Sequence, residues 1–183
     1  MDRIIKELFG SLRSSDNAVR MNALQKVLAL TESRVDWIYE VWEDLFQKLN
    51  HKNSFQRSIA IMVLCNLAKS DGENRLNSSL NLLLEHTRDE KFITSRQCIQ
   101  NIWKIALTND QARETILDHF EQRFRECATE KHYNLIRQDI LQSMVSIWRQ
   151  DKDDTILSRA RELLAEEKDM KYRKKYEYIF SSI

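Results

Sequence analysis

The sequence predicts an all-α protein built from about five pairs of antiparallel helices, and three observations lead to this fold class. First, the chain contains no proline and only two glycines, Gly10 and Gly72, whereas the turns of β-hairpins depend on these residue types. Second, an arginine recurs about every forty residues. Third, apolar residues stand at fixed distances after each of these arginines.

The recurring arginine marks the start of every second predicted helix. It stands at Arg20, Arg57, Arg96, Arg137 and Arg173, at intervals of 37, 39, 41 and 36 residues. Positions three, seven and ten residues later share one face of a helix with 3.6 residues per turn. All residues at these positions are apolar or aromatic, so we expect them to be buried: Ala23, Ala60, Ile99, Ile140, Tyr176; Val27, Leu64, Trp103, Met144, Phe180; Leu30, Leu67, Ala106, Ile147 and Ile183.

The helices that alternate with these carry an apolar face of their own, with spacings of three and four residues. The residues expected on it are Ile4, Leu8, Leu12; Ile38, Val41, Trp42, Leu45, Leu49; Leu76, Leu80, Leu83, Leu84; Ile116, Phe120, Phe124; Ile156, Ala160, Leu163 and Leu164. In order, the predicted helices span about 2–13, 16–31, 35–50, 54–69, 74–88, 92–107, 111–128, 133–150, 154–167 and 169–181. Short polar segments join them, and Ser15 or Asp16 is placed to cap the second helix.

A single helix pair of this size cannot bury its apolar faces, whereas stacked pairs bury them in one extended core. We therefore predict one domain over 1–183, with units at about 1–33, 34–72, 73–110, 111–152 and 153–183. A compact helical bundle is the alternative, but it gives no reason for the recurring period.

The segment from Asp16 to Leu24 resembles the opening of the second helix of a HEAT repeat, with an acid in the turn, a Val-Arg step and an alanine three residues later. The related positions are Arg57 with Ala60, Arg96 with Ile99, and Arg137 with Ile140. The resemblance covers essentially the whole chain and implies a right-handed α-α superhelix, or α-solenoid, of the armadillo/HEAT class. It also implies protein binding on the inner surface, which the second helices line. The chain departs from the family in lacking proline, and it has the turn acid only at Asp16 and Asp169.

Composition and charge narrow the function classes. The net charge is +1, from 29 basic and 28 acidic residues, which disfavours a dedicated nucleic-acid binder. No apolar run approaches the length of a membrane span, and the N-terminus lacks an apolar signal core, so a cytoplasmic protein without membrane partners is expected. The three cysteines, Cys65, Cys98 and Cys127, are widely spaced and odd in number, which predicts that they form no disulfide framework. Cys65 and Cys98 lie in apolar helical stretches, so we expect both to be buried thiols.

The leading functional hypothesis is a non-enzymatic scaffold or adaptor that grips an extended protein segment on its inner face. Amides suit this role because each offers donors and an acceptor. The candidate partner-binding residues are Arg57, Arg96, Gln97, Asn101, Arg137, Gln138, Gln142 and Trp148. The other interpretation of the arginines is structural, because this repeat class uses them to tie neighbouring turns together through carbonyls and acids.

No catalytic, cofactor or metal motif is present: glycine-rich phosphate loops, GxSxG and HExxH are absent, and His119, Cys127 and His132 lack zinc-site spacing. The alternative function is DNA binding or alkylbase DNA glycosylase chemistry, as in some HEAT-like enzymes. It would place Asp139, Arg137 and Trp148 in the site. The basic segment from Lys168 to Tyr176 is either a phosphate-binding patch or the polar outer face of a terminal repeat.

Overall fold

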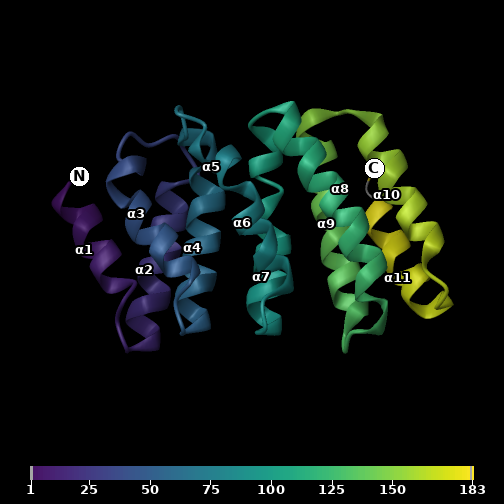
Figure 1. The fold of residues 1–183 in the computed structure, drawn as a ribbon, viewed down its shortest axis with the longest axis horizontal. Helices are drawn as coiled ribbons and strands as arrows, with labels where there is room; N and C mark the ends of the chain where they lie inside the picture. The colour runs from purple at the N-terminus through teal and green to yellow at the C-terminus, as the bar shows by residue number, and fades with distance from the viewer. Residues whose placement is uncertain (1, 182) are drawn as a thin grey trace. The chain divides into compact units, whose positions relative to one another are not determined.

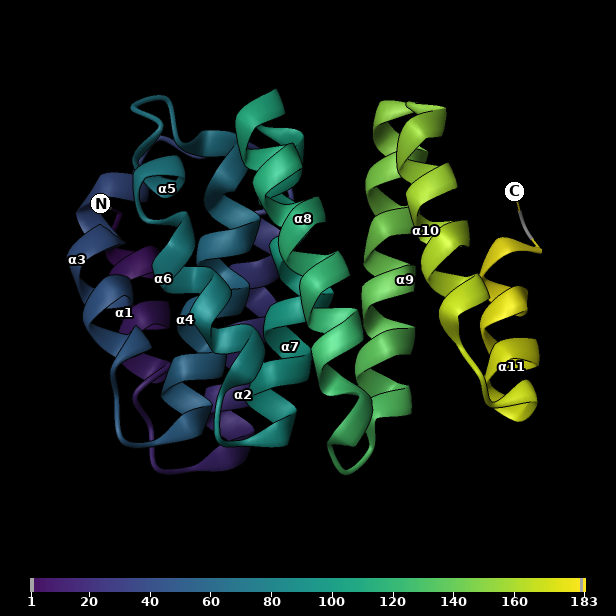
Figure 2. The same ribbon diagram turned by 45° about the vertical axis from the view of Figure 1, so that its right-hand side comes forward.

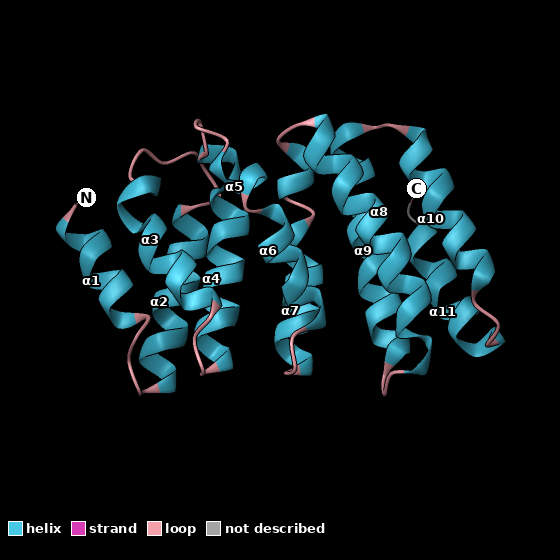
Figure 3. Cartoon of the chain, viewed as in Figure 1, coloured by secondary structure: helices cyan, strands magenta, loops and turns pink. Residues whose placement is uncertain are grey.

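The computed structural model describes residues 2–181 and 183, and within them every regular element is a helix (Figure 3). The all-α prediction is therefore confirmed. No helix in this part of the chain is long and apolar enough to cross a lipid bilayer. The chain divides into two compact units, one ending at Cys98 and one spanning Ile99–Ile183. The single domain over 1–183 stays a prediction.

The first unit consists of two helical hairpins followed by a broken pair. Its elements are α1 (Arg3–Ser11), α2 (Asn17–Leu30), α3 (Ile38–Leu49), α4 (Ser54–Leu67), the 3₁₀ turn Ala68–Ser70, α5 (Arg75–Ser78), α6 (Leu80–Glu85), the 3₁₀ turn His86–Arg88 and α7 (Phe92–Ile102), which crosses the unit boundary. Helix α1 packs on α2, α3 packs on α4, and α2 lies beside α4. The second helices α2, α4 and α7 all begin at the same end of the unit (Figure 1).

The second unit continues with the 3₁₀ turn Ile105–Leu107, α8 (Asp110–Glu126), the 3₁₀ turn Cys127–Thr129, α9 (Tyr133–Asp151), α10 (Asp154–Glu166) and α11 (Met170–Phe180). Helix α9 is central, because α8, α10 and α11 all pack on it. Figure 2 shows α9, α10 and α11 side by side. The predicted helix positions agree with the structure except at 74–88, which is interrupted, and at the C-terminal end of 92–107.

Side chains in the loops explain where most helices begin. Asp16 accepts hydrogen bonds from the backbone N–H groups of Ala18 and Val19 at 2.7 and 3.2 Å, so it caps α2 as one of the two predicted residues. Asp2, Asn53, Asn109, Asp153 and Asp169 cap α1, α4, α8, α10 and α11 in the same manner.

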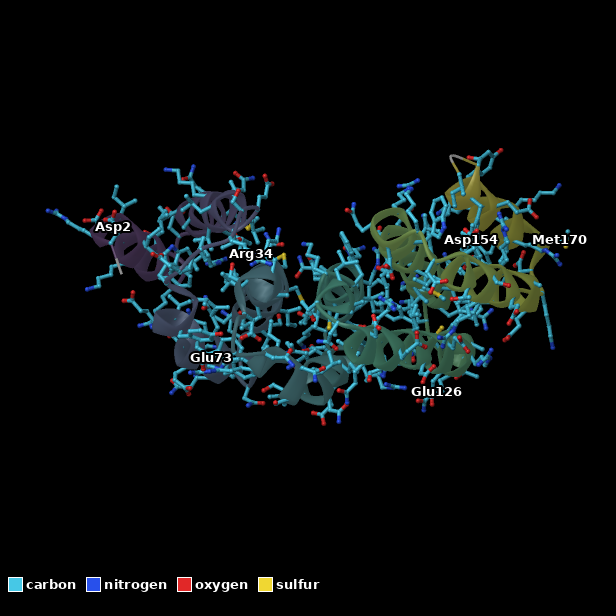
Figure 4. All side chains as sticks on the ribbon, turned by 90° about the horizontal axis from the view of Figure 1, so that it is seen from above. Asp2, Arg34, Glu73, Glu126, Asp154 and Met170 are labelled. Carbon is cyan, nitrogen blue, oxygen red and sulfur yellow. The ribbon has the colours of Figure 1, made fainter. Side chains whose placement is uncertain are left out.

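Side chains fill the space between the helices of each unit (Figure 4), and most of the predicted core positions are buried. All the residues predicted on the faces of α3, α5–α6 and α8 are buried, as are Ala23, Ala60, Ile99, Ile140 and Tyr176. Cys65 and Cys98 are buried thiols, as predicted, and Cys127 is a buried thiol as well. Burial raises the pKa of Cys98 and Cys127, which keeps both in the protonated form near neutral pH.

The prediction for α1 was confirmed at Leu12 and wrong at Ile4. Ile4 is 63% exposed, and the buried face consists of Ile5, Phe9 and Leu12. The ring of Phe9 packs edge-on against Trp37 with 5.7 Å between centroids. Ile5 is buried together with Phe9, and Leu8 is half-buried.

Four other predicted core residues lie near helix ends. Leu30 is the last residue of α2 and is exposed, and Ile183 is exposed beyond α11. Phe180, the last residue of α11, is half-buried. Helix α7 ends at Ile102 instead of continuing to 107, and half-buried Trp103 donates its indole N–H to the carbonyl oxygen of Gln100 at 3.0 Å.

The helix predicted at 74–88 is interrupted at Ser79, between α5 and α6. Consecutive serines, Ser78 and Ser79, have low helix propensity, because their hydroxyl groups compete for backbone hydrogen bonds. The carboxylate of Asp71 also accepts a hydrogen bond from the backbone N–H of Leu76 at 2.7 Å, which holds the start of α5. The leucines of this segment are buried despite the interruption.

Candidate partner-binding groove

Arg57, one of the predicted binding residues, is engaged within its own unit. Its Nε and Nη2 atoms donate to the two carboxylate oxygens of Asp89 at 2.7 Å each, and Nη1 donates to the carbonyl oxygen of His51 at 2.8 Å. Both side chains of this ion pair are nearly buried. Arg57 therefore makes the hydrogen bonds to a carbonyl oxygen and an acid that a structural role of the recurring arginine predicts.

Arg137 is held in a similar way in the second unit. Its Nε donates to the carbonyl oxygen of Phe124 at 3.0 Å, and Nη1 donates to buried Glu167 at 2.8 Å. The guanidinium also lies 4.4 Å from the centroid of the Phe124 ring and 5.1 Å from that of Tyr133. These bonds occupy much of the donor capacity that a bound partner would need.

The Arg57–Asp89 pair predicts a specific pH dependence of stability. Burial raises the pKa of Asp89, but hydrogen bonds from Arg57 and from the backbone N–H of Lys91 outweigh it, and the net pKa lies below its usual value. Because the pKa is lower in the folded state, the stabilisation is present above the unfolded-state pKa of about 4 and is lost as pH falls through the folded pKa. We expect the stability difference between the wild type and Arg57→Ala to shrink below about pH 4. Urea unfolding at several pH values measures it, and a constant difference would contradict the expectation.

The remaining predicted binding residues are distributed over both units. Arg96 and Gln97 are half-buried on α7. Asn101 is half-buried and accepts a hydrogen bond from the Lys104 ammonium at 2.7 Å. Gln138 is half-buried and Gln142 is exposed on α9. Trp148 is half-buried, and its indole N–H donates to Asp154 at 3.1 Å. These residues do not converge on one site within either unit.

The residues considered for DNA glycosylase chemistry also have separate partners. Asp139 is buried and accepts a hydrogen bond from the Gln100 amide at 2.9 Å, whereas Arg137 bonds to Glu167 and Trp148 to Asp154. In the basic C-terminal segment, Lys171, Lys174 and Lys175 are exposed and Tyr176 is buried. Within residues 2–181 and 183, no group of three His, Cys, Asp or Glu side chains is arranged to hold a metal ion.

The first unit carries a groove of about 1100 Å³ over the N-terminal halves of α2, α4 and α7. Its apolar lining includes Met21, Leu24, Leu28, Phe55, Ile59, Met62, Phe92 and Ile93. Phe55 is 56% exposed and Ile93 is 68% exposed. Large apolar side chains clustered at a hollow surface are typical of a binding site.

Apolar atoms form most of the exposed lining of this groove, although Gln25, Glu90, Lys91 and Gln97 also line it. Other polar side chains of the lining are paired. The hydroxyl groups of Ser58 and Thr94 are 3.0 Å apart, and Thr94 also donates to the carbonyl oxygen of Ser54 at 3.4 Å. The amide oxygen of Asn17 accepts a hydrogen bond from Arg20 at 2.9 Å. The groove therefore offers mainly apolar contact.

Sequence reasoning identified one residue of the groove lining, Gln97, as a candidate for partner binding. It missed Phe55 and Ile93, which contribute the most exposed apolar surface. Both stand in the first turn of a second helix, two and three residues before the recurring arginine. Large apolar residues outside the predicted buried positions of a second helix were the sequence feature that could have identified Phe55 and Ile93.

Helix pairs packed side by side, with an apolar groove over the second helices, define an all-α protein of packed helical hairpins. The fold is similar to those of two crystal structures of engineered proteins from the Northeast Structural Genomics Consortium. The first is 14% identical, with a TM-score of 0.58 over 96% of this chain and 77% of that chain. The second is 18% identical, with a TM-score of 0.58 over 96% of this chain and 78% of that chain. At these identities the likeness concerns the fold alone. No known protein family and no curated protein matches the sequence.

Proposed function

We propose that this chain is a non-enzymatic protein-binding scaffold or adaptor of the HEAT-like α-solenoid type. Its site is the apolar groove over α2, α4 and α7, and its partner is an amphipathic helix of another protein. This function needs no cofactor and fits the expected cytoplasmic location. The observation that carries the proposal is the exposure of Met21, Phe55 and Ile93 around one hollow.

The lining favours a bound helix over the extended segment that the amide side chains first suggested. An extended peptide needs donors and acceptors for its backbone, because unpaired peptide groups are costly to bury. The side chains of Ser58 and Thr94 already bond to each other. A helix satisfies its own backbone and needs only apolar contact along one face, which this groove supplies.

Two methionines support adaptable packing at the groove. Met21 lies on α2 and Met62 on α4, and both line it. The unbranched thioether side chain adjusts its shape to different apolar surfaces at low cost. Phe55 and Ile93 provide larger and stiffer contacts, and we expect them to contribute most of the binding free energy.

A charge placed in the groove is expected to weaken binding of helical peptides. The probe is a displayed library of peptides with an apolar stripe at i, i+3, i+4 and i+7, selected on the wild type and then measured by fluorescence anisotropy. We expect Met21→Glu and Ile93→Glu each to weaken binding about 30-fold, which corresponds to about 2 kcal/mol.

The matched controls are Ile4→Glu and Val19→Glu, which also place a charge at an exposed apolar residue but lie outside the groove lining. Their affinities are expected to stay within about twofold of the wild type, as for surface substitutions away from an interface. Equal binding by groove and control variants, with circular dichroism showing all of them folded, would reject the groove as the site.

A further inference from the structure

Before α9, the position three residues ahead of the helix is Glu130, which pairs with Arg123 of α8. Before α4, α7 and α11 the same position carries a repeated hydrogen bond. It is occupied by His51 before α4, by Asp89 before α7 and by Glu167 before α11. Each side chain accepts a hydrogen bond from the backbone N–H two residues later: His51 from Asn53 at 3.0 Å, Asp89 from Lys91 at 2.8 Å and Glu167 from Asp169 at 3.0 Å. The three positions are therefore structurally equivalent.

At two of these positions the side chain is a carboxylate that also pairs with the arginine of the preceding repeat. Asp89 accepts from Arg57, and Glu167 accepts from Arg137. Burying the arginine is possible because the acid compensates its charge. The loop acid is thus one half of a buried ion pair in both cases.

Arg20 repeats the geometry of Arg57 without the acid. Its Nη1 donates to the carbonyl oxygen of Ser14, six residues earlier, at 2.8 Å, as Arg57 Nη1 donates to the carbonyl oxygen of His51, also six residues earlier. His51 stands in relation to Arg20 where Asp89 stands in relation to Arg57, and its side chain has no carboxylate. The Nη2 atom of Arg20 donates instead to the neutral amide of Asn17. Within the described part of the chain, no carboxylate forms an ion pair with Arg20, although only 8% of this residue is exposed.

The uncompensated charge lies at the end of the apolar groove. Arg20 lines the groove, and its guanidinium lies 5.2 Å from the centroid of the exposed Phe55 ring. The Nε group, which Arg57 uses to bind Asp89, makes no hydrogen bond within the described residues. An arginine that is largely buried and lacks a counter-charge is unusual, because such charges are normally paired.

We propose that the partner helix supplies the missing acid: an Asp or Glu at one end of its apolar stripe pairs with Arg20, as Asp89 pairs with Arg57. This inference rests on the proposed function of the groove. The N-termini of α2, α4 and α7 lie at the same end of the unit (Figure 1). Their helix dipoles add to the attraction for a negative charge. The recognised class is therefore an amphipathic helix with an apolar stripe and a terminal acid.

The test uses the peptide library described above, selected in parallel on the wild type and on His51→Asp, which places the acid within the chain. Peptides selected on the wild type are expected to be enriched in Asp or Glu at one end of the stripe. Replacing this acid by its amide should weaken binding to the wild type about tenfold or more and leave binding to His51→Asp nearly unchanged. His51→Asn is the matched control without charge and should keep the acid preference.

Arg20→Gln provides a second, independent variant, because it removes the charge without requiring a new ion pair to form. It should also abolish the acid preference. Two outcomes would overturn this inference and leave the proposed function standing. In the first, peptides that depend on the groove show no preference for an acid on the wild type. In the second, the acid preference persists on both His51→Asp and Arg20→Gln.

The absence of any binder that distinguishes the wild type from Met21→Glu would reject the proposed function itself. A wild-type dimer that Met21→Glu converts to a monomer would identify a second copy as the occupant, which also overturns the inference.

Discussion

Replacing Arg57 by alanine is expected to lower the free energy of unfolding by about 3–5 kcal/mol, because it leaves a buried carboxylate without its partner. The side chain of Asp89 is 3% exposed, so water cannot replace the two hydrogen bonds that Arg57 donates. Urea unfolding measures the change, with an unaltered m-value as evidence that the same surface is exposed.

Arg20→Ala is the matched control for this prediction. Arg20 occupies the same repeat position and makes the same bond to a carbonyl oxygen, but its removal leaves no carboxylate unpaired. We expect a loss of about 1–2 kcal/mol, because the hydrogen bonds to Ser14 and Asn17 are removed. The double variant Arg57→Ala/Asp89→Ala should recover most of the loss caused by Arg57→Ala alone. Equal effects of Arg20→Ala and Arg57→Ala would show that the acid does not determine the cost.

Phe120→Ala is expected to destabilise the second unit by about 3–5 kcal/mol, the range for removal of a fully buried aromatic side chain. Phe120 lies on α8 with no exposed surface. Its removal forfeits the burial of the ring and leaves a cavity that the packed helices cannot fully close. Chemical or thermal denaturation measures the loss.

Phe55→Ala removes the same ring from an exposed site and serves as the comparison. It should cost less than about 1 kcal/mol, since this residue is 56% exposed and its ring contacts Arg20 at the surface. For peptide binding, we expect the relative effects of the two variants to be reversed. Phe55→Ala should weaken the affinity, whereas the folded fraction of Phe120→Ala should bind as the wild type does. A large stability loss for Phe55→Ala would place this ring in the core and remove it from the binding surface.

Phe120 and Phe55 show how the packing of the helices places one phenylalanine in the core and another at the groove. Helices α2 and α4 direct Ala23, Val27, Ala60 and Leu64 inward. Exposed Met21 and Phe55 lie on the same two helices and line the groove. A row of parallel helices therefore carries an apolar groove in addition to its buried core.

The local sequence determined the helices and most of their buried faces. Apolar spacing of three and four residues, together with loop residues such as Asp16 and Asn53, is sufficient to predict where a helix begins and which side is inward. This local information was insufficient to predict which residues are buried at the ends of the chain and of the helices. Ile4 and Ile5 are equally apolar, and only the folded structure shows that Ile5 is buried and Ile4 exposed.

Tertiary structure alone decided the chemistry of the candidate site. The repeat spacing identified the arginines, but whether each one is paired depends on a side chain about thirty residues later in the next loop. Asp89 lies within reach of Arg57 and Glu167 within reach of Arg137, whereas His51 leaves Arg20 without an acid. Hydrogen bonds and ion pairs act over a few ångströms. The sequence therefore predicts helices from neighbours along the chain, whereas the groove and its charge arise from residues that only folding brings together.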